Sequence, residues 1–347
     1  MSGTAFESAI PTFFDPEKVA RVWRVAYQDI ADRGREWRQQ YSILPADSDR
    51  LRVCLLAIDV QNTFCLPEFE LFVGGASGMG AVEDNQRLCE FIYRNLGQLT
   101  AIAPTMDTHT AMQIFHPCFW INAAGEHPAP AVTNITLDDV QEGRWRANPA
   151  VAHSVMNGDI AALESYALHY ARTLSEEGKY PLTIWPYHSM LGGIGHALVS
   201  SFEEACFFHA IARSQQTLFE LKGNHPLTEN YSVLRAEVLS GENGEVIANK
   251  NSTFLQKLLD FDRLIIAGQA KSHCVAWTVS DLLDEILAID PTLAEKVYLL
   301  EDCTSPVVVP SVIDFSDPAN AAFSRFAEAG MHRVQSTDPI ESWPKWS

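Results

Sequence analysis

The segment "LIIAGQAKSHCVAWTV" (264–279) joins an apolar run to a helical pattern through a short polar turn. The apolar run stops at Gly268, and Cys274 stands where the helical pattern begins. A run that is apolar on both faces and leads into a helix is typical of a buried parallel strand. The segment therefore predicts an α/β fold with a thiol just beyond the carboxyl end of a strand.

The same alternation extends through most of the chain. The runs that predict strands are VCLLAID (53–59), LTAIAPTM (99–106), LTIWP (182–186), TLFELK (217–222), RLIIAGQ (263–269) and KVYLLED (296–302). The clearest predicted helices between them are Glu83–Leu96, Ile160–Leu174, Val199–Ala212, Thr253–Phe261 and Val275–Leu287. Apolar strands that alternate with helices and connect by right-handed crossovers predict a three-layer α/β/α domain around a mainly parallel sheet.

Two regions stand apart from this pattern. Residues 1–50 carry an amphipathic segment, Pro16 to Tyr41, which predicts an N-terminal helical extension packed on the body or on another subunit. Residues 117–184 are long for a connection, so we interpret them as an insertion in the main domain, 51–347, that lies over the site or at a subunit contact.

Composition excludes several classes of protein. The formal net charge of -19 over 347 residues disfavours binding to nucleic acid or to an anionic membrane, because the excess carboxylates repel phosphate. There are seven cysteines but no CxxC pair, which argues against a disulfide framework and a zinc knuckle. With no long apolar stretch and no signal-peptide pattern, we expect a soluble cytoplasmic protein.

Polar residues follow the predicted strands. Ligands of open parallel sheets bind beyond the carboxyl ends of the strands, where the loops converge. The residues with catalytic or ligating chemistry at these ends are Asp59, Asp107, His109, His188, Lys222 and Cys274. We therefore expect them on one rim of the sheet.

Three of these residues suggest nucleophilic catalysis. Near a helix N-terminus, Cys274 gains thiolate character and backbone N–H groups for an oxyanion, although a small residue filling a turn fits the same position. Asp59 is either a general base for that thiol or a turn-capping aspartate. Lys222 either pairs with Asp59 and lowers the pKa of the thiol, or is a solvated charge at a strand end.

The other three suggest a metal site. Asp107, His109 and His188 supply one carboxylate and two imidazoles, a set that suits zinc, iron or manganese. His116 is a further ligand, a partner of a ligand, or a histidine satisfied by the backbone.

Together these stretches resemble the nicotinamidase/pyrazinamidase branch of the isochorismatase-like cysteine hydrolases. The matching stretches are AIDVQNTFC (57–65), ELFVGGASG (70–78), TMDTHTAMQIFHP (105–117), WPYHSMLGGIG (185–195), ELKGNHPLTENYS (220–232) and AGQAKSHCV (267–275). Their order is that of the family, and the resemblance covers roughly Arg52 to Pro306.

The resemblance implies a six-stranded parallel sheet and hydrolysis of a small carboxamide, such as nicotinamide, to an acid and ammonia through a thioester. Asp59, Lys222 and Cys274 would be catalytic, and the N–H groups of Ala270 and Cys274 would form the oxyanion hole. It also implies a non-proline cis peptide at Gln269–Ala270 and self-association into a homo-oligomer.

The remaining implied roles concern the metal and the substrate. Asp107, His109 and His188 would hold one divalent ion, zinc or otherwise iron or manganese, which in the family binds the pyridine nitrogen. The aromatic walls of the substrate pocket would be Phe64, Trp185 and Tyr231, which composition alone would assign to core packing.

Four residues depart from the family pattern. Thr63 stands where an acidic residue is common, Ser272 where aspartate precedes the His-Cys pair, and Ser189 where cysteine is frequent, while His116 is displaced by one residue. These departures leave open a related hydrolase that acts on a carbamoyl, ureido or other small amide. A binding protein without turnover is a different class, and the presence of Asp59, Lys222 and Cys274 disfavours it. The isochorismatase reaction is also disfavoured, because it uses no metal triad.

Overall fold

The computed structural model describes residues 9–309, 311 and 313–346 and divides into two compact units. The first unit comprises Met1–Met106, Ala197–Glu220 and Ser252–Ser347, and the second comprises Asp107–His196 and Leu221–Asn251.

A six-stranded sheet, as counted over the described residues, has the order β12-β9-β8-β1-β2-β7. Its strands are β1 (Val53–Ile58), β2 (Ala101–Asp107), β7 (Glu220–Lys222), β8 (Arg263–Gly268), β9 (Val297–Leu300) and β12 (His332–Val334). The pairs β1–β2, β1–β8, β8–β9 and β9–β12 are all parallel. All six residues of β1 are buried, as expected for a strand covered on both faces.

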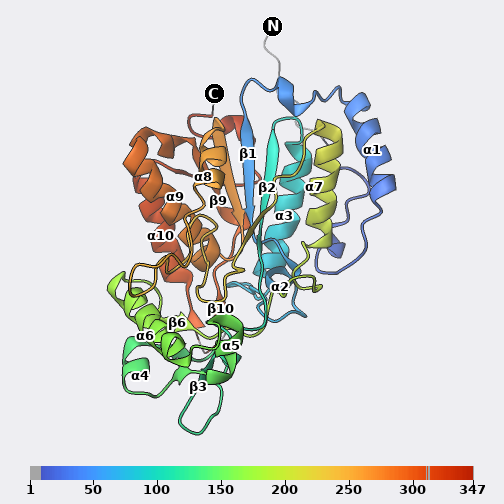
Figure 1. Ribbon diagram of the computed structural model, residues 1–347. Coiled ribbons are helices and arrows are strands. Elements are labelled where there is room, and N and C mark those ends of the chain that lie inside the picture. The colour runs from blue at the N-terminus through green and yellow to red at the C-terminus, as the bar shows by residue number, and fades with distance from the viewer. Residues whose placement is uncertain (1–8, 310, 312, 347) are drawn as a thin grey trace. The chain divides into compact units, whose positions relative to one another are not determined.

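Helices cover both faces of this sheet (Figure 1). Alternate β1 residues, Val53, Leu55 and Ala57, belong to one apolar cluster with buried side chains of α3 (Gly80–Arg94) and α7 (Ser200–Arg213). On the other side, α9 (Ala276–Ile289) packs against α10 (Ser316–Glu328). The predicted three-layer α/β/α fold is therefore confirmed.

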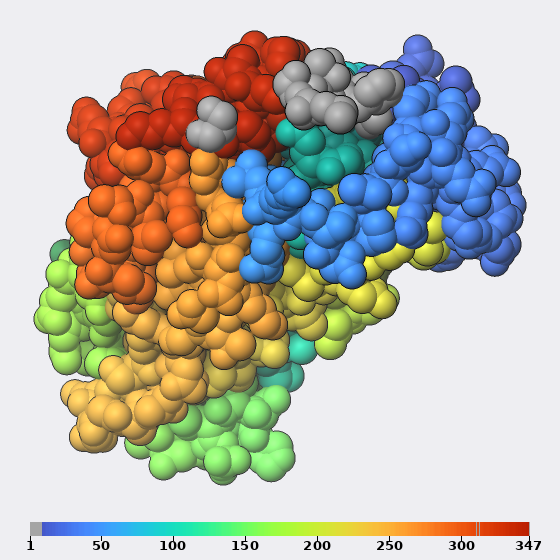
Figure 2. Space-filling model, turned by 90° about the horizontal axis from the view of Figure 1, so that it is seen from above, coloured from blue at the N-terminus to red at the C-terminus, as the bar shows by residue number. Residues whose placement is uncertain are grey.

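The N-terminal segment packs on the first unit. Helix α1 (Tyr27–Gln40) contacts α7, and Figure 2 shows the blue N-terminal segment beside the yellow α7 region. The expectation of one helix from Pro16 is wrong, because α1 begins at Tyr27. The backbone of Trp23 instead hydrogen-bonds the hydroxyl of Ser200, whose Oγ accepts from the N–H at 2.9 Å and donates to the carbonyl at 2.8 Å.

Two strand assignments need correction. The run 182–186 is not part of the central sheet, because β6 (Leu182–Thr183) pairs antiparallel with β4 (Asn134–Ile135). The sixth central strand is β12, which the sequence pattern did not reveal. As an edge strand with exposed Arg333 and half-buried His332, β12 lacks a continuous apolar run.

The second unit has its own apolar core and contains the predicted insertion. Its largest helix is α6 (Ile160–Glu176), and its short elements are β3 (Trp120–Ile121), α4 (Leu137–Gln141), β5 (Arg146–Ala147) and α5 (Ala152–Val155). Elsewhere lie α2 (Asn62–Cys65), α8 (Ser252–Leu259), β10 (Val308–Val309) and β11 (Ile313–Asp314). Among the described residues, none of the helices has the length and apolarity that crossing a membrane requires.

Candidate functional site

The second unit brings together Asp107, His109 and His188. Asp107 ends β2, and the backbone N–H of His109 donates to the carbonyl of Ser189 at 3.0 Å, which ties the two histidine segments together. One candidate ligand atom from each of the three residues lies within 4.8 Å of the others, and all three side chains are buried. The convergence predicted for these residues is therefore present.

Backbone carbonyls orient both imidazoles. The Nδ1 atom of His109 lies 2.9 Å from the carbonyl oxygen of Gly223, and Nδ1 of His188 lies 2.8 Å from that of Pro186. A carbonyl only accepts, so each Nδ1 carries the proton and each Nε2 is left to bind a metal. The Nε2 atoms lie 2.7 Å (His109) and 3.6 Å (His188) from Oδ2 of Asp107.

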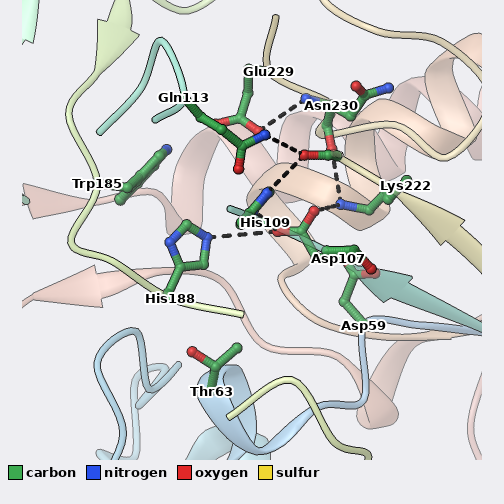
Figure 3. Close-up of polar contacts among 12 residues, drawn as sticks. Asp59, Thr63, Asp107, His109, Gln113, Trp185, His188, Lys222, Glu229 and Asn230 are labelled. Carbon is green, nitrogen blue, oxygen red and sulfur yellow. Dashed lines mark hydrogen bonds and ion pairs between the residues drawn. The ribbon is translucent and has the colours of Figure 1, made fainter. Parts of the chain in front are cut away.

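The two carboxylate oxygens of Asp107 have different partners (Figure 3). Oδ1 accepts from Nζ of Lys222 at 2.8 Å, and the same Nζ donates to the carbonyl of Asn230 at 2.8 Å. Burial raises the pKa of Asp107, but the charges of His109 and Lys222 outweigh it and hold the pKa well below the ordinary value. Asp107 is therefore ionised and ready to ligate a cation.

A glutamine that sequence reasoning did not single out supports this cluster. Nε2 of the buried Gln113 donates to the carbonyls of Gly223 at 2.7 Å and His225 at 3.2 Å. Gly223 has φ +80°, and a Cβ there would meet Oδ1 of Asp107 at 2.6 Å and Cε1 of His109 at 2.7 Å. The local signal was present in the sequence, since Gln113 lies within the Asp-x-His stretch and Gly223 follows Lys222.

A buried glutamate of the second unit was also missed. Oε1 of Glu229 accepts from the N–H of Asn230 at 2.9 Å, and the hydroxyl of Tyr170 accepts from the N–H of Glu229 at 3.2 Å. Burial raises the pKa of Glu229 to about 7, although the charges of His109 and Lys222 lower it. The segment that carries Lys222, Glu229 and Asn230 is thus held by buried polar contacts.

His116 lies outside the group of three. Its Nδ1 donates to the carbonyl of Ala111 at 3.1 Å, and its ring centroid lies 6.0 Å from those of His109 and His188. Burial and the two neighbouring imidazoles lower the pKa of His116 to about 3. Its backbone bond matches the interpretation of a buried, neutral histidine.

The three ligating side chains fit a divalent transition metal. One buried carboxylate and two imidazoles whose Nε2 atoms face it are the ligand types that zinc, iron and manganese accept. Three protein ligands also leave coordination positions for water or substrate. Asp107, His109 and His188 would therefore hold the ion.

The first unit contains the predicted nucleophile. Cys274 is 8 % exposed and lies in a π-helical turn, Lys271–Val275, between β8 and α9. The carbonyl of Ala270 accepts from the N–H groups of His273 at 3.0 Å and Val275 at 3.1 Å, which fixes this turn. The peptide bond Gln269–Ala270 is cis, as the resemblance implies.

Asp59 follows the strand beside the one that leads to Cys274. β1 and β8 pair through Ile58 and Gly268, so the chain leaves β1 at Asp59 next to the turn Lys271–Val275 that carries Cys274, the nucleophile turn. The hydroxyl of Thr105 donates to Oδ1 of Asp59 at 2.6 Å and accepts from its N–H at 3.1 Å. Thr105 thus fixes the carboxylate. The suggested pairing of Lys222 with Asp59 stays a prediction.

A buried carboxylate holds the residue before Ala270. Oδ2 of Asp84 accepts from Nε2 of Gln269 at 2.8 Å, while its Oδ1 pairs with Arg87 at 2.9 Å. The N–H of Ser305 donates to Oε1 of Gln269 at 3.3 Å. Asp84 therefore anchors the start of the nucleophile turn, a role that the sequence pattern did not reveal.

The three predicted aromatic residues divide between the units. In the second unit, Nε1 of Trp185 donates to the hydroxyl of Tyr231 at 3.1 Å. Phe64 belongs to α2 and packs in the apolar cluster of the first unit. Their roles in substrate binding stay predictions.

Comparisons with known proteins give likeness of fold alone. No protein-family model and no curated protein matches the chain. Similar solved structures include a nicotinamidase/pyrazinamidase of Acinetobacter baumannii, with 17% identity, a TM-score of 0.49, and coverage of 84% of this chain and 99% of that chain.

Two further similar structures come from yeast and Pyrococcus horikoshii. The yeast nicotinamidase bound to the inhibitor nicotinaldehyde is 16% identical, with a TM-score of 0.49 and coverage of 82% of this chain and 99% of that chain. The pyrazinamidase of Pyrococcus horikoshii in complex with zinc is 16% identical, with a TM-score of 0.42 and coverage of 82% and 99%. These structures are of the branch that the sequence motifs resemble, but identities and scores at this level carry no inference about substrate or metal.

Proposed function

We propose that the protein is a metal-assisted cysteine amidohydrolase that cleaves a small, nicotinamide-like carboxamide to an acid and ammonia through a thioester. The observation that carries this proposal is the buried group of Asp107, His109 and His188, with both Nδ1 atoms bonded to backbone carbonyls. A cluster so arranged can ligate, because both Nε2 atoms face Oδ2 of Asp107 and would give up any proton they carry when a metal ion binds.

The nucleophilic half of the chemistry is assigned to the first unit. Asp59, fixed by Thr105, takes the proton of Cys274, and the sulfur attacks the carboxamide carbon. The N–H groups of Ala270 and Cys274 stabilise the oxyanion. Asp59 then returns the proton to the departing amino group, which leaves as ammonia. Water attacks the thioester, Asp59 takes a proton from the water and passes it to the leaving sulfur, and the acid and the free thiol are released.

Binding of the metal ion and the substrate is assigned to the second unit, as is the positive charge of Lys222. A metal ion held by Asp107, His109 and His188 would act as a Lewis acid that orients the substrate. Lys222 keeps Asp107 ionised. In the role predicted from the sequence, it also pairs with Asp59 and lowers the pKa of the Cys274 thiol. Trp185 and Tyr231 are proposed to wall the substrate.

An ammonia-release screen tests this function. We expect release from nicotinamide or pyrazinamide, its loss after treatment with EDTA, and its recovery when Zn²⁺, Fe²⁺ or Mn²⁺ is restored. Release only from biuret-like or carbamoyl compounds would assign the related hydrolase instead. Full turnover by metal-free protein would contradict the metal-assisted proposal.

A further inference from the structure

A separate pocket of about 360 Å³ lies in the second unit. Thirteen residues line it, all from this unit: 221–225, 230, 233–235 and 248–251. Its volume is that of a small-molecule site. Lys222 hydrogen-bonds Asp107, the carbonyl of Gly223 bonds His109, and both residues also line this pocket. The same stretch of chain therefore borders the candidate metal site and the pocket.

The lining is rich in hydrogen-bond donors. Three lining side chains are cationic, Lys222, Arg235 and Lys250, and four asparagine amides add neutral donors: Asn224, Asn230, Asn249 and Asn251. The N–H of Leu227 donates to Nδ1 of His225 at 3.3 Å, which places the ring proton of His225 on Nε2 as a further donor. Amides, guanidinium and ammonium together match the oxygens of an anion.

Carboxylates are missing from the lining. The chain contains 44 Asp and Glu residues, yet none of the thirteen lining residues is acidic. Two lining cations pair with carboxylates that lie outside the lining: Nζ of Lys222 lies 2.8 Å from Oδ1 of Asp107, and Nη2 of Arg235 lies 3.1 Å from Oε2 of Glu177. Nε of Arg235 is buried and has no hydrogen-bond partner among the described residues. The charged side chains of the lining are therefore all positive, in a protein whose net charge is -19.

We propose that this pocket binds a small, multiply charged oxyanion, either a phosphate or a polycarboxylate. Arg235 and Lys250 supply the charge, and the asparagine amides and His225 Nε2–H complete the hydrogen bonds. The site goes beyond the proposed function, because anion binding here requires neither Cys274 nor a metal ion.

Isothermal titration calorimetry of the full-length, EDTA-treated protein tests this site, with inorganic phosphate and citrate as probes and sorbitol as an uncharged control. We expect one saturable site for an oxyanion and none for sorbitol. Tighter binding of phosphate identifies a phosphorylated ligand, and tighter binding of citrate identifies a polycarboxylate. Absence of saturable binding for both oxyanions would overturn the proposal.

Matched lysine variants localise the binding. Lys250→Gln removes an exposed lining charge, while Lys257→Gln removes an exposed charge on α8, outside the pocket. We expect K250Q and Arg235→Gln each to weaken binding at least about tenfold, the size of one lost charge-assisted hydrogen bond, and K257Q to leave it unchanged. Equal affinity in K250Q and K257Q would overturn the proposal.

Two further measurements separate this site from the proposed active site. Cys274→Ala should bind the probe as the wild-type protein does. Phosphate affinity should also be the same with and without the metal; binding seen only in metal-loaded protein would place the anion on the metal and overturn the assignment.

Discussion

Nζ of Lys222 lies 2.8 Å from Oδ1 of Asp107, and both side chains are at most 5% exposed. This buried pair leaves Oδ2 of Asp107 facing the Nε2 atoms of two histidines. A lysine thus compensates a carboxylate whose other oxygen is available to a metal ion.

Lys222→Met should destabilise the metal-free protein by about 3–5 kcal/mol, because it leaves the Asp107 carboxylate buried without its ammonium partner. A bound divalent ion would restore part of that compensation, so the loss should be smaller in metal-loaded protein. Urea denaturation with and without EDTA measures both. As a control, Lys345→Met removes an ion pair with Glu295 that is exposed to solvent, and should change the free energy of unfolding far less. Equal losses for the two variants would be inconsistent with this interpretation.

Gly223→Ala should abolish metal binding. The new methyl group would lie 2.6 Å from Oδ1 of Asp107 and 2.7 Å from Cε1 of His109, so the cluster must move. Gly244 has nearly the same backbone conformation, with φ +81° against +80°, but open space around its Cβ position. Gly244→Ala therefore carries the same backbone strain of about 1–2 kcal/mol without the collision. Metal analysis by mass spectrometry should find about one ion per chain in Gly244→Ala and none in Gly223→Ala; equal metal content would refute the proposed contact.

His209 should make the protein lose stability as the pH falls. Burial lowers the pKa of His209 to about 4, and its Nε2–H donates to the carbonyl of Leu99 at 2.8 Å. Because the pKa in the folded state is below the unfolded value of about 6.5, the unfolded chain takes up a proton first as the pH falls. The stabilisation is complete above pH 6.5 and shrinks toward pH 4.

His209→Gln keeps a side-chain donor and removes this titration. Between pH 7 and pH 5 the wild-type protein should lose about 2 kcal/mol more than the variant, as measured by urea denaturation at each pH. The exposed His153→Gln serves as the control and should follow the wild-type curve. Parallel curves for all three proteins would count against the assignment.

Asp84→Ala should lower kcat roughly ten- to a hundredfold with little change in KM, because Asp84 positions the nucleophile turn through Gln269 and does not bind substrate. Gln269→Leu should have a similar effect, since it breaks the same hydrogen bond. The double variant should then be little worse than either single variant. Multiplicative losses in the double variant would show that the two residues act independently.

The fold was largely predictable from the sequence, because buried strands such as β1 and β8 are apolar on both faces and therefore easy to recognise. The edge strand β12 escaped notice because its residues are partly exposed. The run 182–186 was misassigned because a short apolar run has the same composition in a central strand and in a small antiparallel pair.

The candidate metal ligands were predictable because each follows an apolar run, and the motif order reinforced them. The residues that orient the cluster were less visible. Gly223 acts through its carbonyl, and Gln113 bonds backbone atoms more than a hundred positions away. Contacts of this kind depend on tertiary structure, and the sequence marks only that Gln113 lies within the Asp-x-His stretch and that Gly223 follows Lys222.

The central claim is that Cys274 is the nucleophile of an amidohydrolase. The most direct test is ammonia release from nicotinamide by Cys274→Ala, beside Cys118→Ala, which removes the half-buried thiol of the second unit. The account predicts that Cys274→Ala keeps its metal but releases no ammonia, while Cys118→Ala stays active. Undiminished ammonia release by Cys274→Ala would contradict it.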